Sequence, residues 1–365
     1  MFFCDWQSYK EKRFFLSKMN SSFSSIRVLA QVLSALTLTC IFPIFPPVHA
    51  APAPAPGETH VAKWKGNKKA AFLLMFDDGW PSHWQVAVPE LVKRGMVATF
   101  YVVPKKGEYV KFEKEWKKAV EQGMTLGNHT MTHDGFQGAE DAEMEVGGCT
   151  RYLLDFVPGK NPRLISFGLP GVKDYNFGEG NSLKALLTKY HLVDRGDFKG
   201  HGAVYHWKTT EEMIALADKA IAAGGLEYLV VHGVERITPD WGFQDLWPLK
   251  QDIFLPLLDM LKERMDRGDL WITDHVSAHQ YETERQGAKV RVVATDPRGI
   301  RLECSSDADP QFYDLPLTLQ TSVPPAWQQC CVAQGAQQIE VKAAKGVVQF
   351  EALPNGGVIT LQPIQ

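Results

Sequence analysis

The sequence predicts an α/β protein built on a parallel sheet, open or closed into a barrel, with a small all-β domain after it. Between residues 64 and 285, apolar strand candidates alternate with helical patterns about seven times. Such alternation is typical of a parallel sheet with helical crossovers. After residue 285 no long helix is evident, and short segments broken by Asp-Pro, Pro-Pro and Asn-Gly pairs predict a β-sandwich.

The elements of the first region follow from apolar runs and helix-end signals. Strands are predicted at 70–76, 98–103, 124–126, 164–167, 192–193, 228–231 and 270–272. Helices are predicted at 85–94, 112–122, 141–156, 183–190, 211–223 and 253–267. Thr209 and Glu212 form a capping-box pattern before one helix, and Gly224 marks its end. In the second region, strands are predicted at 289–293, 300–304, 315–321, 338–342, 346–350 and 358–361.

The first fifty residues have the pattern of a secretory signal peptide. Basic residues precede an apolar run that ends near residue 45, and Val48-His49-Ala50 resembles a cleavage site. A membrane anchor is the alternative, but the run is shorter than the ~20 residues that span a bilayer comfortably. We therefore expect a signal peptide over 1–50, an Ala/Pro linker over 51–63, the α/β region over 64–285 and the β domain over 286–365. The expected location is secreted or periplasmic, without a stable membrane anchor.

Composition narrows the possible partners. The 365 residues include 39 Lys and Arg against 42 Asp and Glu, a formal net charge of −3, and no basic block. This balance argues against a nucleic-acid partner. Export permits disulfides, and Cys304 could pair with Cys330 or with Cys331, a choice that spacing alone leaves open.

Two adjacent carboxylates follow the most apolar strand. The run from Leu73 to Phe76 leads directly into Asp77, Asp78 and Gly79. Side chains alternate along a strand, so the two acids diverge unless the chain turns, which Gly79 permits. Because like charges this close repel, a cation is expected beside them.

Two histidines are candidate ligands for that cation. His129 and His133 lie just beyond the third predicted strand, and on a helix this spacing places both on one face. Two imidazoles and one carboxylate make a three-ligand set that leaves positions open, as catalytic metal sites do. The sequence thus predicts a divalent metal held by both histidines and one acid of the Asp77–Asp78 pair.

With these motifs, the chain resembles the polysaccharide deacetylase family (carbohydrate esterase family 4) over about residues 64–285. The family's first motif matches Met75 to Gly79, with Met75 in place of threonine. Its second matches His129 to His133, and its last, Leu-x-x-His, matches Leu229 to His232. The resemblance implies a distorted (β/α)₇ barrel. It also implies hydrolysis of acetyl groups on a polysaccharide or oligosaccharide, with N-acetylglucosamine polymers as the first choice.

The resemblance also implies residue roles. Asp78, His129 and His133 would ligate the metal, most commonly Zn²⁺, with Co²⁺, Ni²⁺ or Mn²⁺ as alternatives. Asp77 would be the general base and His232 the general acid. Alternatives are an O-acetyl esterase of the acetylxylan type, an amidase acting on a non-sugar substrate, and a carbohydrate-binding pseudoenzyme.

The chain departs from the family at its third motif. Gly168 stands where an arginine usually orients the base, and Arg195 or, less favourably, Lys173 could replace that cation. Gly171 lies at the position where, in the family, a backbone N–H donates to the oxyanion of the reaction. The acids that could hold the catalytic histidine are Asp194 and Asp197, with Asp274 a weaker candidate, and each could equally be a turn or cap residue.

Side chains expected near a bound sugar complete the set. Aromatic residues occur in the predicted loops beyond the strands, where they could stack on sugar rings or pack the rim of the barrel. The predicted substrate contacts are Trp80, Tyr175, Trp241 and Leu229. The β domain carries no pattern that suggests catalysis, and we expect it to be accessory.

Overall fold

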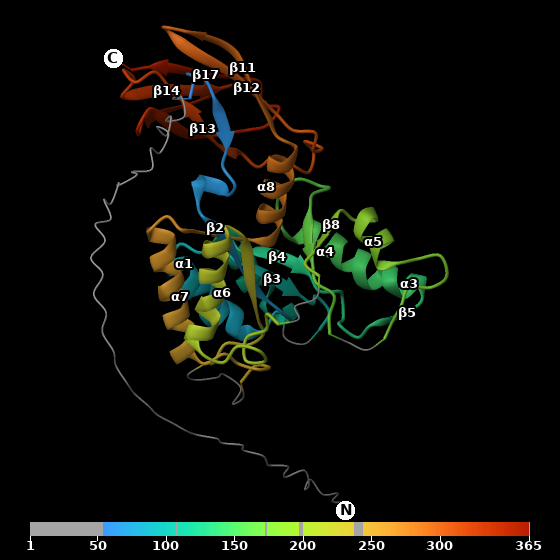
Figure 1. Ribbon diagram of the computed structural model, residues 1–365. Coiled ribbons are helices and arrows are strands. Elements are labelled where there is room, and N and C mark those ends of the chain that lie inside the picture. The colour runs from blue at the N-terminus through green and yellow to red at the C-terminus, as the bar shows by residue number, and fades with distance from the viewer. Residues whose placement is uncertain (1–53, 107–108, 172–173, 197–199, 237–243, 365) are drawn as a thin grey trace, which may run out of the picture. The chain divides into compact units, whose positions relative to one another are not determined.

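Seven parallel strands form the sheet that organises the first region of the computed structural model, which describes residues 54–106, 109–171, 174–196, 200–236 and 244–364. The sheet contains β2 (Ala70–Phe76), β3 (Thr99–Val102), β4 (Thr125–Asn128), β6 (Ile165–Phe167), β8 (Leu192–Asp194), β9 (Leu226–Val231) and β10 (Leu270–Thr273). All seven coincide with predicted strands to within two residues. The predicted α/β class, with a distorted, partly open barrel of parallel strands, is confirmed (Figure 1).

Strand β2 is the centre of this sheet. It pairs with β9 along residues 71–76, while β10 pairs with its first half and β3 with Met75 and Phe76. All seven residues of β2 are buried. A strand that is covered on both faces has no exposed side, which explains why its sequence is uninterruptedly apolar.

Helices follow the strands and cover the outside of the sheet. They are α1 (Val88–Lys93), α2 (Glu113–Glu121), α3 (Ala139–Ala142), α4 (Cys149–Phe156), α5 (Leu183–Lys189), α6 (Thr210–Ala223) and α7 (Gln251–Asp266). The main apolar cluster lies between these helices and the sheet. The barrel interior holds a smaller cluster that includes Leu73, Met75 and Tyr101.

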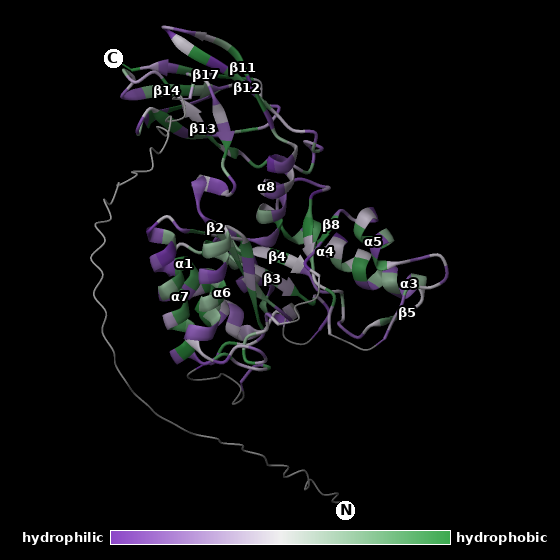
Figure 2. Ribbon diagram, in the orientation of Figure 1, coloured by the Kyte–Doolittle hydropathy of each residue, from purple (hydrophilic) through white to green (hydrophobic). Residues whose placement is uncertain are grey.

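Helix α6 shows how local sequence sets these boundaries. The hydroxyl of Thr209 accepts from the backbone N–H of Glu212, whose side chain returns the bond, and Gly224 ends the helix at φ 61°. The predicted capping box and stop are confirmed. In Figure 2, α6 and α7 show alternating hydrophilic and hydrophobic bands, as helices with one buried face do.

Helix α8 (His275–Gly287) was not predicted from the sequence. Its buried residues are only Ala278, Tyr281 and Glu284, so the segment lacks a continuous apolar stripe. Asp274 caps its start by accepting from Ser277, which is the cap alternative weighed for this residue. The Tyr281 hydroxyl donates to the carbonyl of Ala62 and its ring packs into the core of the β domain.

The β domain consists of two antiparallel sheets, as predicted. One contains β1 (Thr59–Val61), β13 (Leu317–Ser322) and β16 (Val347–Ala352). The other contains β11 (Lys289–Asp296), β12 (Gly299–Ser305), β17 (Val358–Pro363), β14 (Gln329–Gln334) and β15 (Gln337–Lys342). Strand β14 was not predicted. Strand β1 lies inside the stretch 51–63 predicted as linker, and it joins β13 in the sheet (Figure 1).

The cysteine prediction is wrong: Cys149, Cys304, Cys330 and Cys331 are all free thiols. Cys304 lies in β12 and Cys330 in β14, and β17 runs between those strands. Strands β12 and β14 are therefore two strand spacings apart, which is ~9–10 Å. A disulfide requires Cα atoms within ~7 Å.

Among the described residues, no helix is long and apolar enough to cross a membrane. The predicted signal peptide lies outside the described residues.

Candidate functional site

The two carboxylates diverge because the chain turns at once after β2. Asp78 has φ 76° and Gly79 has φ 69°, so two consecutive residues adopt the left-handed conformation. That conformation costs a non-glycine residue about 1–3 kcal/mol and is often found at functional sites. Asp77 points into the buried interior and is 1% exposed, whereas the carboxylate of Asp78 is part-exposed. The two acids are therefore set up for different roles.

His129 and His133 approach each other in a loop and not across one turn of a helix. The segment after β4 is irregular, with Thr130 at φ 64° and His133 at φ 65°. These turns bring the two imidazole ring centres to 5.1 Å. The loop is held by buried polar groups: Glu145 accepts from both the N–H and the hydroxyl of Thr132.

Three ligand atoms converge at this point. Oδ1 of Asp78 lies 3.3 Å from Nε2 of His133 and 3.5 Å from Nε2 of His129, and the three residues meet the geometry of a metal-binding group. His129 Nδ1 lies 2.6 Å from the carbonyl oxygen of Gly168, which can only accept, so Nδ1 carries the proton. Neutral His129 therefore presents the lone pair of Nε2 to the Asp78 oxygen, and a divalent cation between these two acceptors would be held by both. This donor set fits a divalent metal.

Trp80 fixes the orientation of the acidic ligand. Its indole Nε1–H donates to Oδ2 of Asp78 at 3.0 Å. The second oxygen, Oδ1, is thereby left to face the histidines. Trp80 was predicted as a substrate contact; the structure shows it hydrogen-bonded to the ligand carboxylate, a position that orients metal ligands in other proteins.

Arg195 is the buried cation beside Asp77. Its two terminal nitrogens donate to the two carboxylate oxygens at 2.6 and 2.7 Å, and both side chains are 2% exposed. The guanidinium also lies 4.2 Å from the ring centre of Tyr101. A Cβ atom on Gly168 would come within 2.6 Å of Nε of Arg195. The arginine thus occupies the space that a side chain at position 168 would need.

Charge neighbours keep both acids ionised. Burial raises the pKa of Asp77, but the attraction and hydrogen bonds of Arg195, aided by His129, outweigh it and leave the pKa below its usual value. Burial likewise raises the pKa of Asp78, and the imidazoles of His129 and His133 bring it well below its usual range.

His232 follows β9 at the same edge of the sheet. Burial lowers its pKa, and the negative charges of Asp77 and Asp78 act in the opposite direction. Its ring packs against Trp247 at 5.1 Å and Tyr205 at 6.0 Å, and both aromatic side chains are exposed. The backbone oxygen of His232 accepts from Nε2 of buried His83, which anchors the end of the strand.

Comparison with known proteins identifies this part of the chain. A family model described as "Polysaccharide deacetylase" matches residues 65–167. The chain carries a polysaccharide deacetylase domain. The matched segment contains Asp77, Asp78, His129 and His133, while Arg195 and His232 lie beyond it.

Several known proteins resemble longer parts of the chain. A gellan lyase from Bacillus sp is 21% identical over 338 residues, which are 84% of this chain and 13% of that protein, so the chain spans only a small part of it. A family 4 carbohydrate esterase from Streptomyces lividans is 20% identical, over 55% of this chain and 90% of that one, with a TM-score of 0.35. A family 4 acetyl xylan esterase from Clostridium thermocellum, bound to cobalt, is 17% identical over 56% and 87%, with a TM-score of 0.37. At these scores the structural likenesses carry no argument of their own.

Other predicted site residues of the deacetylase domain make contacts that differ from their predicted roles. Asp194 is exposed and accepts from the N–H of Gly196 in a turn, the alternative weighed for it. Leu229 packs on the helix side of the sheet and is fully buried, so its predicted substrate contact is wrong. Tyr175 donates its hydroxyl to the carbonyl of Pro170 and packs on Phe136.

The remaining predicted residues stay predictions. Gly171 is exposed, with nothing within 4 Å of where its Cβ would lie. Asp197, Trp241 and Lys173 lie outside the described residues.

Sequence reasoning missed the buried network that supports His232. Asp245 accepts from the N–H of Ser82 at 2.8 Å and from Arg236 at 3.0 Å. The Ser82 hydroxyl in turn accepts from the N–H of Val234, two residues after His232. No local pattern marks Ser82, because its contacts with Val234 and Asp245 join segments more than 150 positions apart.

A cavity of about 270 Å³ opens beside the metal-binding group. Asp78, Trp80 and His133 line it together with Lys106 and Leu246. It gives a ligand direct access to the atoms that face the metal position.

Proposed function

We propose that this protein is a secreted or periplasmic metal-dependent hydrolase that removes acetyl groups from a polysaccharide, with N-acetylglucosamine polymers as its first substrate class. The observation that carries the proposal is the pairing of a three-ligand group, Asp78, His129 and His133, with a second carboxylate, Asp77, held ionised by Arg195. Metal-dependent hydrolysis requires both a cation site and a nearby base. The proposed ion is Zn²⁺, with Co²⁺, Ni²⁺ or Mn²⁺ as alternatives.

Each polar residue would have one task. Asp78, His129 and His133 would hold a divalent cation, which when bound would act as a Lewis acid toward water and an acyl carbonyl. Asp77, whose Oδ2 lies 4.0 Å from Nε2 of His129, would accept the proton of the attacking water. Arg195 orients that carboxylate through two hydrogen bonds. His232 would protonate the departing nitrogen; burial lowers its pKa, and the negative charges of Asp77 and Asp78 offset part of that effect.

The test is acetate release from acetylated chitooligosaccharide, acetylxylan and peptidoglycan, measured in parallel with elemental analysis of the same protein. The expected result is release from the amide-linked substrates. Asp77→Asn should lower the rate about 10²–10⁴-fold while the metal content stays unchanged. Asp134→Asn is a matched control in the histidine loop, because the Asp134 side chain is 77% exposed and its carboxylate lies 3.7 Å from Lys106.

Three outcomes would contradict the proposal. Release from acetylxylan alone would assign an esterase, and release from none of the three substrates with metal bound would favour a carbohydrate-binding pseudoenzyme. An unchanged rate in Asp77→Asn would remove this residue from the mechanism. For the proposed export, cell fractionation should recover the protein outside the cytoplasm.

A further inference from the structure

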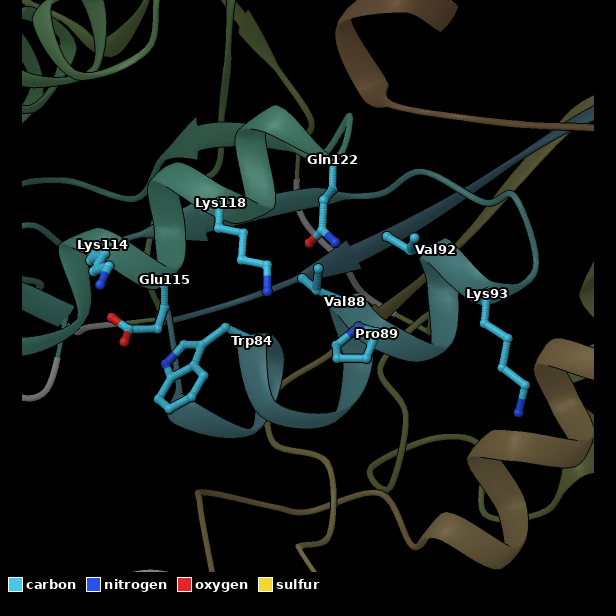
Figure 3. A pocket seen from close by; sticks show the side chains of 9 residues that line it. All are labelled: Trp84, Val88, Pro89, Val92, Lys93, Lys114, Glu115, Lys118 and Gln122. Atoms are coloured by element: carbon cyan, nitrogen blue, oxygen red, sulfur yellow. The ribbon is translucent and has the colours of Figure 1, made fainter.

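The largest of the described cavities lies on the outside of the barrel, apart from the metal-binding group. It has a volume of about 650 Å³ and runs between α1 and α2. Ligand sites of small molecules span roughly 300–1,000 Å³, so this groove is large enough for several sugar rings. Figure 3 shows Lys118 on α2 and Gln122 at the end of α2 pointing toward Val88 and Pro89 on α1, with Trp84 on the short π-helix (His83–Ala87) that precedes α1.

Charge in the groove is strongly one-sided. Lys93, Lys114 and Lys118 line it, against the single lining carboxylate of Glu115. Lys93 makes a loose 3.7 Å contact with Glu90, and its side chain is 69% exposed. Lys114 and Lys118 are exposed and form no ion pair with any described residue. In a chain with a net charge of −3, these lysines around one groove make its surroundings locally positive.

An aromatic side chain lies at one end of the same groove. The ring of Trp84 packs on Phe112 at 4.7 Å, and its Nε1–H is buried without a hydrogen-bond partner among the described residues. An unpaired buried N–H costs free energy that a ligand oxygen could recover. Pro89 and Val92 add apolar surface and Gln122 an amide (Figure 3).

We propose that this groove binds an anionic segment of a polysaccharide through its carboxylate groups. Sugar rings offer C–H faces for the indole and proline, ring hydroxyls for Nε1 of Trp84 and the amide of Gln122, and carboxylates for the lysines. A neutral glycan would leave the lysines unused, and a simple polyanion would leave the indole unused. The site is separate from the metal-binding group, so it can anchor a polymer without taking part in the reaction.

The experiment measures binding of hexagalacturonate to the full chain by calorimetry, with neutral cellohexaose as the comparison ligand. We expect hexagalacturonate to bind, more weakly as salt rises because the ion pairs are exposed, and cellohexaose to bind more weakly or not at all. Lys114→Gln/Lys118→Gln should weaken binding about 2–5-fold for each lysine, as expected of exposed ion pairs. Lys117→Gln is the matched control, because Lys117 lies on the same helix but faces the ring of Phe156.

A second variant separates a glycan site from a general polyanion site. Trp84→Phe keeps an aromatic ring at this position and removes the N–H together with the five-membered part of the indole, so it should weaken the binding of hexagalacturonate but not that of inorganic polyphosphate. The proposal is wrong if the double lysine variant binds like Lys117→Gln, or if cellohexaose binds as well as hexagalacturonate. It is also wrong if polyphosphate binds as tightly as hexagalacturonate and Trp84→Phe affects neither. Because the readout is binding, these results do not depend on whether the metal-binding group releases acetate.

Discussion

Replacing Arg195 by leucine should expose how strongly this protein depends on one buried cation. The guanidinium makes two hydrogen bonds to Asp77, at 2.6 and 2.7 Å, and both side chains are 2% exposed. Removing it leaves a carboxylate in the interior without a counter-charge. Breaking a buried ion pair in this way costs about 3–5 kcal/mol in the free energy of unfolding near pH 7.

The loss should depend on pH in a defined direction. In the wild type the pKa of Asp77 is lowered, so the pair stabilises the fold above the ordinary pKa of about 3.9 and this stabilisation is lost as pH falls. In Arg195→Leu the effect of burial remains without the arginine, so the pKa of Asp77 rises. The gap in stability between the two proteins should therefore be widest at neutral pH and narrow toward pH 4.

Urea unfolding in the presence of a chelator at several pH values measures this gap without relying on activity. The matched control is Arg264→Leu, because Arg264 also donates two hydrogen bonds to one carboxylate, that of Asp218, at 2.7 Å each, while the Asp218 side chain is 52% exposed. Loss of that pair should cost no more than about 1 kcal/mol. Equal losses in the two variants, or a gap for Arg195→Leu that does not change with pH, would refute the reasoning.

Activity provides the second readout for Arg195. If Asp77 is the base, the acid limb of kcat/KM for acetate release should move to higher pH in Arg195→Leu. Gly168→Ala should have a related effect with Arg195 intact, because the new Cβ would lie 2.6 Å from Nε and displace the guanidinium.

Three further predictions concern the metal-binding group and helix α8. Trp80→Phe removes the N–H that holds Oδ2 of Asp78 and should weaken Zn²⁺ binding about 10–100-fold in a competition titration with a chelator. Zn²⁺ should raise the melting temperature of the wild type but not of Asp78→Asn. Burial raises the pKa of Glu284 to about 7. The protonated carboxyl group therefore contributes to the free energy of unfolding below pH 4.5, and this contribution is lost as pH rises from about 4.5 to 7. Glu284→Gln should be more stable than the wild type at pH 8, by about 1–2 kcal/mol, and no more stable at pH 4, measured by urea unfolding.

The local sequence predicted those elements that are marked by continuous burial or by residues typical of helix ends. A fully buried strand such as β2 must be apolar throughout, and a capped helix such as α6 carries its own boundaries. Helix α8 and strand β1 lacked such marks. Helix α8 has few buried residues, and β1 is three residues long and depends on pairing with β13, more than 250 positions away.

The candidate site divides in the same way. The sequence alone determined which residues could meet, because Asp77, Asp78, His129, His133 and His232 follow strands whose carboxyl ends share one edge of a parallel sheet. It also marked Arg195, at the end of β8, as one of two possible replacements for the missing cation at position 168.

Only the tertiary structure decided between the alternatives. It placed the guanidinium of Arg195 against Asp77 and in the volume left free by Gly168, a contact between residues 118 positions apart. It also placed both histidines in a loop held by Glu145, whereas their spacing alone would equally fit one face of a helix. The physical reason is that spacing along the chain determines the face of an element, whereas the direction and burial of a side chain are set by the packing of distant segments.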